Sequence, residues 1–299
     1  MRVVFCPYLA AMWPSLAPLY DEHVAAGDEV IVMPLPYYVR DYTGTPIKRF
    51  VDCTFPVKVT APDFHHLENL LPDRIYFHNP YDDRNRITMI DPEFFSTKLA
   101  QCTHDLVFVP YYTFPFGDDL FSIIMAPGVR VADRIIVWDA ASKRNYIDAL
   151  SRLVQKDWAS MITVKDRPAS PIDYAMPKDW ERIAKGRRLI FFNTSVVPLI
   201  QDGPHEIRKI HDTISAYHND DSCLLWRPHP LFEAAIMAIH PELRRAYYRT
   251  VDDFKRNRLG IFDTSPDLER AVALSSYYVG DPSSVAIFFE KQHKPVRII

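Results

Sequence analysis

Apolar and polar residues alternate along this chain in two different rhythms. Short apolar runs that end in turn residues predict buried strands, whereas apolar residues spaced three or four positions apart predict helices. In the first half, the predicted strands are residues 3–6, 29–33, 74–77, 106–110 and 134–137, and the predicted helices are 13–25, 94–100, 120–125 and 142–154. Strands that alternate with helices in this way are typical of α/β folds with mainly parallel sheets.

The alternation lapses twice and then returns in the second half. Residues 34–63 are rich in Tyr, Pro and Thr and predict an extended excursion, and residues 158–187 are rich in Pro and charge and predict a linker. The later predicted strands are 188–192, 223–226, 261–262, 277–279 and 296–299, and the later helices are 206–217, 231–238, 241–256, 268–274 and one that begins at Ser283 and Ser284. We therefore expect two Rossmann-like domains, 1–157 and 188–299, that face each other across a ligand-binding cleft.

The composition of the chain argues against several classes of function. The chain has 299 residues, 48% of them hydrophobic, and its 35 Lys and Arg nearly balance 38 Asp and Glu to give a net charge of −3. This balance argues against a nucleic-acid partner. The 8 Gly form neither a P-loop nor a dinucleotide fingerprint.

The cysteines and the chain start indicate the compartment. Cys6, Cys53, Cys102 and Cys223 are scattered without CxxC spacing, and we expect reduced thiols. The apolar run at residues 1–7 is too short for a signal peptide, and no run reaches transmembrane length. We expect a cytoplasmic protein.

The strongest candidate site lies near the end of the chain. A strand over 277–279 runs through the turn Gly280-Asp281-Pro282 into Ser283 and Ser284, which start a helix. Unpaired N–H groups and the helix dipole at such a start attract anions. The alternative is that Ser283 or Ser284 only caps the helix.

Two other strand ends of the same domain carry similar chemistry. One strand ends in Arg227 and His229, a guanidinium and an imidazole suited to a phosphate, and another ends in Asn193, Thr194 and Ser195. The alternatives are an Arg paired with a carboxylate beside an idle His, and a plain polar turn. The coincidence of three such ends in one domain favours phosphate binding.

Other polar and aromatic groups have plainer explanations. The acidic pairs 82–83, 118–119, 220–221 and 252–253 lack Asp-x-Asp spacing at a strand end, so we expect exposed faces and neither a metal nor a cofactor. Aromatic residues after strands either line an acceptor cleft or pack in the core. The basic helix over 241–258 either is a solvated face or contacts an anionic lipid-linked acceptor at a membrane.

The chain resembles a known family at this point. Arg227-Pro-His-Pro230, then Asp281-Pro-Ser-Ser284, then Lys294-Pro-Val296 look like the C-terminal half of the CDP-glycerol glycerophosphotransferases, which are teichoic-acid-type enzymes with the GT-B fold. Residues 7–16, 33–38, 78–82, 111–112 and 132–136 look like the N-terminal half of a less characterised bacterial branch. Pro282 stands where family members more often have Tyr.

The resemblance implies roles for individual residues. By similarity to the family, His229, Ser283 and Ser284 bind the diphosphate of the donor, and we expect His229 to be catalytic because it stabilises the charge of the reacting diphosphate. We add Arg227, Asp281, Asn193, Thr194 and Ser195 as donor-binding candidates. The family motif Trp-His-Gly corresponds to Phe77-His78-Asn79, which implies His78 as the general base that deprotonates the acceptor hydroxyl. The alternative is a buried His78 bonded to Asp82 or Asp83. On the acceptor side we expect Trp13, Asn79 and Tyr81.

The resemblance implies a transferase that moves glycerol phosphate from CDP-glycerol, or a similar nucleotide-activated donor, to a hydroxyl of a glycan or lipid-linked acceptor in cell-envelope polysaccharide synthesis. Work at the inner face of the membrane, with a peripheral membrane contact, fits this function. Two alternatives stay open: a GT-B glycosyltransferase that uses a nucleotide sugar, and a non-catalytic nucleotide-binding partner protein. The second is suggested by the position of Ile299 directly after the last strand, without the terminal helix common in GT-B proteins.

Overall fold

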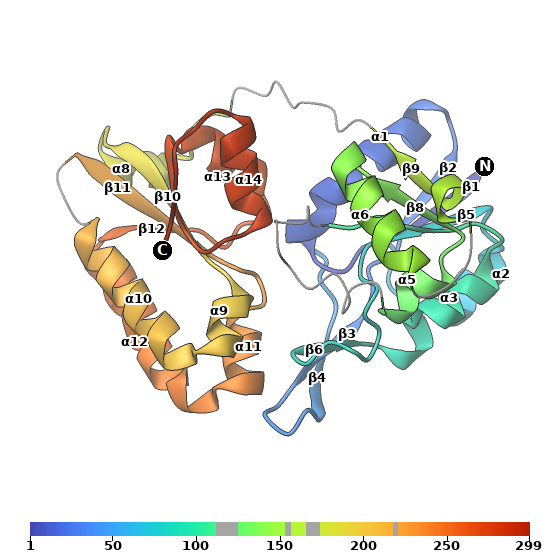
Figure 1. Ribbon diagram of the computed structural model, residues 1–299, viewed down its shortest axis with the longest axis horizontal. Helices are drawn as coiled ribbons and strands as arrows, with labels where there is room; N and C mark the ends of the chain where they lie inside the picture. The colour runs from blue at the N-terminus through green and yellow to red at the C-terminus, as the bar shows by residue number, and fades with distance from the viewer. Residues whose placement is uncertain (112–124, 153–156, 166–173, 218–220) are drawn as a thin grey trace. The chain divides into compact units, whose positions relative to one another are not determined.

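The chain divides into two units. The computed structural model describes residues 1–111, 125–152, 157–165, 174–217 and 221–299 (Figure 1). The first unit comprises Met1–Val39 and Pro46–Ser170, and the second comprises Arg40–Thr45 and Pro171–Ile299. Each unit has its own sheet and its own hydrophobic core.

The first unit is built on a six-stranded parallel sheet in the order β2-β1-β5-β7-β8-β9. The strands are β1 Arg2–Cys6, β2 Glu29–Val32, β5 Arg74–Phe77, β7 Leu106–Phe108, β8 Arg134–Val137 and β9 Ile162–Val164. The helices are η1 Ala10–Ser15, α1 Ala17–Ala25, α2 Phe64–Leu70, η2 Pro92–Phe94, α3 Ser96–Cys102, α5 Pro127–Val131, α6 Ala140–Ser151 and α7 Trp158–Met161. Residues 120–124 of the helix predicted over 120–125 lie outside the described residues.

A small sheet in the order β4-β3-β6 accounts for the predicted excursion. Its strands are β3 Tyr37–Arg40, β4 Pro46–Phe50 and β6 Thr88–Ile90, and β3 pairs antiparallel with β6. At the tip of the β3–β4 hairpin, Asp41 accepts hydrogen bonds from the backbone N–H groups of Thr43 and Thr45 at 2.9 and 3.0 Å. The turn is therefore fixed by its own side chain.

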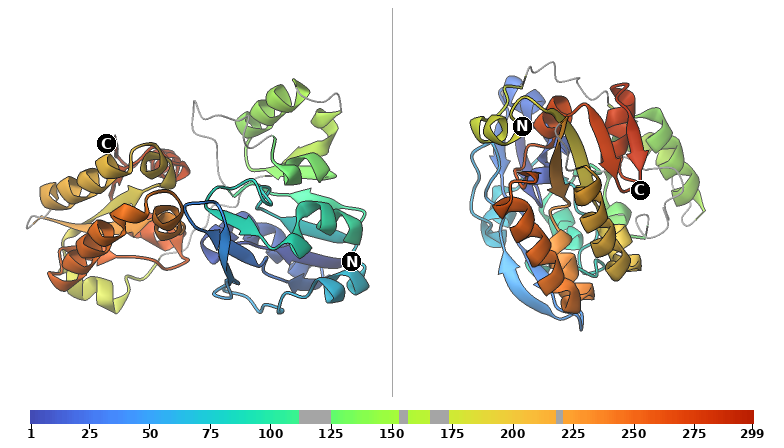
Figure 2. Two further views of the ribbon diagram at one scale, coloured as in Figure 1. Left: turned by 90° about the horizontal axis from the view of Figure 1, so that it is seen from below. Right: turned by 90° about the vertical axis from the view of Figure 1, so that its left-hand side faces the viewer.

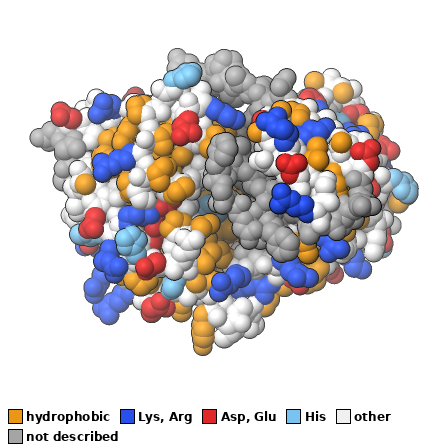
Figure 3. All heavy atoms as spheres, in the orientation of Figure 1, with side chains coloured by type: hydrophobic (Ala, Val, Ile, Leu, Met, Phe, Trp, Pro, Cys, Tyr) orange, Lys and Arg blue, Asp and Glu red, His pale blue; other side chains and the backbone are white. Residues whose placement is uncertain are grey.

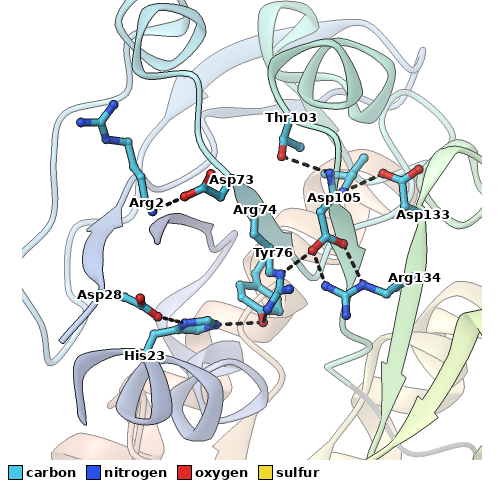
Figure 4. Close-up of polar contacts among 11 residues, drawn as sticks. Arg2, His23, Asp28, Asp73, Arg74, Tyr76, Thr103, Asp105, Asp133 and Arg134 are labelled. Atoms are coloured by element: carbon cyan, nitrogen blue, oxygen red, sulfur yellow. Dashed lines mark hydrogen bonds and ion pairs between the residues drawn. The ribbon is translucent and has the colours of Figure 1, made fainter. Parts of the chain in front are cut away.

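Ion pairs and hydrogen bonds occupy the edge of the first sheet where its strands begin (Figure 4). His23 contacts Asp28 at 2.6 Å through Nδ1 and the Tyr76 hydroxyl at 3.0 Å through Nε2. The Asp105 carboxylate accepts a hydrogen bond from Nε of Arg74 at 2.6 Å and also pairs with Arg134. These groups satisfy one another, and none belongs to the predicted site.

The second unit is built on a five-stranded parallel sheet in the order β12-β11-β10-β13-β14, whose strands run side by side in Figure 2. The strands are β10 Arg188–Thr194, β11 Ser222–Pro228, β12 Gly260–Phe262, β13 Tyr277–Gly280 and β14 Val296–Ile298. The helices are α8 Lys178–Ala184, α9 Val196–Gln201, α10 Gly203–Ala216, α11 Phe232–Ile239, η3 Pro241–Leu243, α12 Arg244–Arg256, α13 Leu268–Leu274 and α14 Ser284–Lys291.

Helices cover both faces of this second sheet, with α13 and α14 on one side and α10 and α12 on the other in Figure 1. On one face, Phe191 of β10 packs in a cluster with residues of α8, α13 and α14. On the other, Trp226 of β11 contacts the rings of Tyr247 and Phe254 of α12 edge-on. Burial on both faces explains why β10 and β11 are apolar nearly throughout.

The predicted linker over 158–187 contains helices and a strand on either side of residues 166–173, which lie outside the described residues. It contains α7, the edge strand β9, which pairs with β8, and α8. Trp158 and Ile162 are buried in the first unit, and Trp180 and Ala184 in the second. Elements this short show too few periods to be recognised against a Pro-rich background.

Candidate functional site

The three polar strand ends of the second unit lie together. In the parallel register, Asn193 of β10 is paired with Arg227 of β11 on one side and with Gly280 of β13 on the other. The segments that follow, from Ser195, His229 and Asp281, therefore start at one edge of the sheet. This is the carboxyl edge, where open α/β sheets bind ligands.

The loops after β10 and β13 are tied to each other. The Asn193 amide donates to the Ser283 hydroxyl at 3.3 Å, and the Asp281 N–H donates to the Asn193 carbonyl at 3.3 Å. Gly280 has a φ of 146°, and a Cβ there would overlap the Asn193 carbonyl oxygen. The close approach of the two loops therefore depends on a glycine at this position.

Ser283 and Ser284 have different environments. Ser283 is the N-cap of α14, and its hydroxyl accepts from the Ala286 N–H at 3.4 Å and contacts the Tyr278 hydroxyl at 3.0 Å. No described residue accepts a hydrogen bond from the Ser284 hydroxyl or from the N–H groups of Ser284 and Val285. The donors open to an anion at this helix start therefore belong to Ser284 and Val285.

Helix α9 begins at the same edge. Its N-cap is Ser195, whose side chain makes no capping hydrogen bond, while the Ser195 N–H donates to the Asp281 carboxylate. Thr194 is fully buried, and its hydroxyl accepts from the Trp226 indole at 3.3 Å. Of the predicted polar run, Ser195 is half-buried and its hydroxyl makes no capping hydrogen bond, whereas Thr194 is part of the interior and does not fit the predicted donor-binding role.

His229 lies at the start of the β11–α11 loop with one nitrogen available. Its backbone N–H donates to the Thr194 carbonyl at 2.8 Å, and its Nδ1 accepts from the Leu231 N–H at 3.1 Å. The neutral ring then carries its proton on Nε2. Burial lowers the pKa of His229 to about 4, and the residue as a whole is half-buried. The side chain is thus a neutral hydrogen-bond donor near pH 7.

The guanidinium of Arg227 is bonded to residues other than the candidate phosphate-binding groups. It is buried, and its guanidinium donates to the Asp263 carboxylate and to the Ser265 hydroxyl at 3.4 Å. Removing one partner of such a buried pair leaves an uncompensated charge. The pairing of Arg227 with a carboxylate is the alternative that the sequence left open. Arg227 therefore anchors the segment after β12, and its guanidinium is not available to a phosphate.

Asp281 is also an internal residue, and it contacts a buried ion pair, Lys209 with Glu206, that the sequence motifs did not indicate. Its side chain is fully buried and accepts from the Ser195 N–H and from Lys209. Lys209 also pairs with Glu206 at 2.7 Å on the same helix. The sequence signal for this pair is only an i, i+3 spacing, which is common on solvated helices.

His78 in the first unit is enclosed on both ring nitrogens. It is fully buried, accepts from the Tyr8 N–H at Nε2 at 2.7 Å, and contacts the Ser15 hydroxyl at Nδ1 at 3.1 Å. Burial lowers its pKa to about 3. This environment does not fit a general base, because the lone pair of Nε2 is already used. The predicted alternative partner Asp82 instead accepts from Ser96 at 2.9 and 2.6 Å.

The predicted acceptor-side residues belong largely to the interior. Trp13 is 5% exposed and packs edge-on with Tyr20 and Phe55 in the core of the first unit. Asn79 is buried and accepts from the Tyr81 N–H at 3.0 Å, which fixes a turn after β5. Tyr81 is half-buried and takes part in further contacts.

Two other features concern metals and membranes. In the described part of the chain, no three His, Cys, Asp or Glu side chains gather as a metal site, and no helix there is long and apolar enough to span a bilayer. The helix α12 exposes Arg244, Arg245, Arg249, Lys255 and Arg256, and Figure 3 shows Lys and Arg side chains gathered over the region of α10 and α12.

Comparison with solved structures identifies proteins of the same fold. S. aureus MnaA, in a co-structure with UDP, aligns over 99% of this chain and 78% of its own, with 13% identity and a TM-score of 0.58. UDP-GlcNAc 2-epimerase from Methanocaldococcus jannaschii, in complex with UDP-GlcNAc and UDP, aligns over 100% and 83%, with 10% identity and a TM-score of 0.56. The wall teichoic acid polymerase TagF, soaked with CDPG, aligns over 98% and 68%, with 11% identity and a TM-score of 0.53.

No family model matches the sequence, and no curated protein matches it. At 10 to 13% identity, the structural similarities show the fold alone. That fold is the α/β, GT-B-like fold with mainly parallel sheets that the sequence predicted.

Proposed function

We propose that the protein is a GT-B transferase that binds the diphosphate of a nucleotide-activated donor at the carboxyl edge of the second sheet. The observation that carries this proposal is the convergence of unpaired donors there: the start of α14 with Ser284, the Ser195 hydroxyl and the Nε2–H of His229. Neutral donors and helix dipoles hold a diphosphate without a metal. The structural neighbours that carry UDP or CDPG support a nucleotide donor.

The specific reaction that we propose is transfer of glycerol phosphate from CDP-glycerol. An acceptor hydroxyl attacks the β-phosphorus, the bond from this phosphorus to the bridging oxygen breaks, and CMP leaves while the hydroxyl proton passes to a base. Negative charge grows on the oxygens next to Ser284 and His229 during this step, where fixed donors stabilise it. In this proposal the base is a group other than His78, and the acceptor is a glycan or lipid-linked hydroxyl.

A second candidate is a reaction on a nucleotide sugar, because two of the solved structures with this fold contain UDP or UDP-GlcNAc. The same diphosphate site would serve either donor, and the pocket beyond it would differ.

Calorimetric titration tests both candidates. We expect CMP and CDP-glycerol to bind without added metal, and Ser284→Ala and His229→Ala each to weaken binding by about tenfold, since each removes a hydrogen bond to an anion. Ser215→Ala, which deletes an exposed hydroxyl on α10, is the matched control. Selective uridine binding would favour the nucleotide sugar, and no binding of any nucleotide would refute the proposal.

A further inference from the structure

A cluster of three buried charges lies directly behind the start of α9. It consists of Glu206 and Lys209 on α10 and Asp281 in the loop after β13. The side chains of Glu206 and Asp281 have no exposed surface, and that of Lys209 is 13% exposed. Charges at this depth are weakly screened, so they act on their neighbours over several ångströms.

The cluster touches the proposed diphosphate site through a single carboxylate. One oxygen of Asp281 accepts from the Ser195 N–H, and the other accepts from Lys209. The position of Ser195 at the N-cap of α9 is therefore coupled to Lys209 through Asp281. Loss of the Lys209 ammonium would leave the Asp281 carboxylate without its cation and would loosen its hold on this loop.

The cluster contains two carboxylates, those of Glu206 and Asp281, and one ammonium, that of Lys209. The helix α9 carries no titratable side chain, the charged side chains of η3 and α12 are exposed, and the half-buried His240 before η3 is paired with Glu242. Among the described residues, Asp281 and Lys209 are the charged groups that act on Glu206. Burial, with Asp281 adding to it, raises the pKa of Glu206 to about 7. Among the described residues, neither oxygen of Glu206 accepts a well-aligned hydrogen bond, despite the contact to Lys209. Glu206 is thus a poorly compensated acid behind an anion site.

We infer that Lys209 is a positioning residue that balances the charge of Asp281 and Glu206 and thereby allows a diphosphate to bind beside them. The inference rests on the proposed anion site. Without the ammonium, two carboxylates would repel the ligand, and the Ser195 loop would lose its anchor. With Glu206 neutral, the same site would attract a diphosphate more strongly.

The test measures binding of inorganic pyrophosphate to the full chain by calorimetry at pH 8. Pyrophosphate has no nucleobase, so its binding does not depend on which nucleotide the donor carries. We expect Lys209→Met to weaken binding by about tenfold or more, Lys209→Arg to restore most of it, and Glu206→Gln to tighten it several-fold, in line with one unit charge at short range. Lys291→Met, which removes an exposed cation at the far end of α14, is the matched control. A thermal melt of each variant separates loss of affinity from loss of fold.

Each outcome decides the inference. If a folded Lys209→Met variant binds like the wild type, or if Glu206→Gln weakens or does not change binding, the inference is wrong. If Lys209→Met does not fold, Glu206→Gln and Lys209→Arg decide alone. Wild-type protein that binds no pyrophosphate overturns the inference, whereas protein that binds pyrophosphate but no nucleotide overturns only the proposed donor.

Discussion

Two histidines show how far residue type predicts chemistry in this chain. His78 and His229 both follow a buried strand, and the sequence suggested a catalytic role for each. The structure engages both ring nitrogens of His78, whereas His229 keeps Nε2 available. The difference comes from Tyr8 and Ser15, which lie far from His78 in the sequence. Such partners are invisible to a motif search.

The first prediction concerns His78 and stability. Because burial holds its pKa near 3 against about 6.5 in an unfolded chain, its contribution is fully present above pH 6.5 and is lost as pH falls from there toward 3. We expect His78→Ala to lower the free energy of unfolding by about 2–4 kcal/mol at pH 8, since it leaves a cavity and an unpaired Tyr8 N–H. The cost should shrink at pH 5. Urea denaturation at both pH values measures it.

His78→Gln is the informative control, because its side-chain oxygen can accept from the Tyr8 N–H in place of Nε2. It should recover part of the stability, and neither variant should change nucleotide affinity. A His78→Ala variant as stable as the wild type at pH 8 would contradict the structural role.

For the rest of the candidate site, too, the sequence predicted the positions at strand ends but not the contacts made by residues distant in the sequence. The sequence placed Asn193, His229 and Ser283 at strand ends, and the parallel register brings them together, because hydrophobic runs and turn residues determine where strands stop. It did not separate Ser283, which caps a helix, from Ser284, whose hydroxyl is available. It also missed Lys209, whose role depends on a contact across the fold to Asp281.

At the scale of elements, the loop after β13 carries the strictest local requirement. Gly280 combines a φ of 146° with close approach to Asn193, whereas Gly186 has a φ of 77° and nothing within 4 Å of its would-be Cβ. The first position restricts both conformation and space, and the second restricts conformation alone.

We therefore expect Gly280→Ala to destabilise the protein by several kcal/mol and to abolish nucleotide binding, because β13 must move away from β10 to admit the methyl group. Gly186→Ala should cost only about 1 kcal/mol, the price of a left-handed residue, with affinity unchanged. Chemical denaturation and calorimetry on both variants measure this contrast. Equal effects of the two substitutions would contradict the packing argument.

Element prediction was most successful where the apolar runs were long. The strands β10 and β11 are buried nearly throughout and were found from sequence, although each extends past its predicted end. The short elements β9, α7 and α9 were missed, since three to six residues carry too little periodicity. Tertiary pairing, as between β9 and β8, stabilises them instead.

At the scale of the whole molecule, the two units have separate cores. Phe5 of β1 and Phe191 of β10 are both fully buried on parallel strands, but each belongs to a different cluster. Proteins built from separate cores often depart from two-state unfolding.

A matched pair of substitutions tests this organisation. Phe5→Ala and Phe191→Ala should each cost about 3–5 kcal/mol in the unit that contains them. Hydrogen exchange followed by mass spectrometry should show reduced protection in the first sheet for Phe5→Ala and in the second sheet for Phe191→Ala. Loss of protection in both sheets from either substitution would show that the units unfold as one.

The strand order of the second sheet has a consequence for biosynthesis. β10 is central, with β11 on one side and β13 on the other, yet β13 leaves the ribosome more than eighty residues after β10. During that interval one side of an apolar strand has no partner, and unpaired apolar edges are prone to aggregation. The nascent chain should therefore depend on chaperones until residue 284 emerges, and the proposed nucleotide donor could not assist folding earlier, because Ser284 of its proposed site is synthesised after Ser195 and His229.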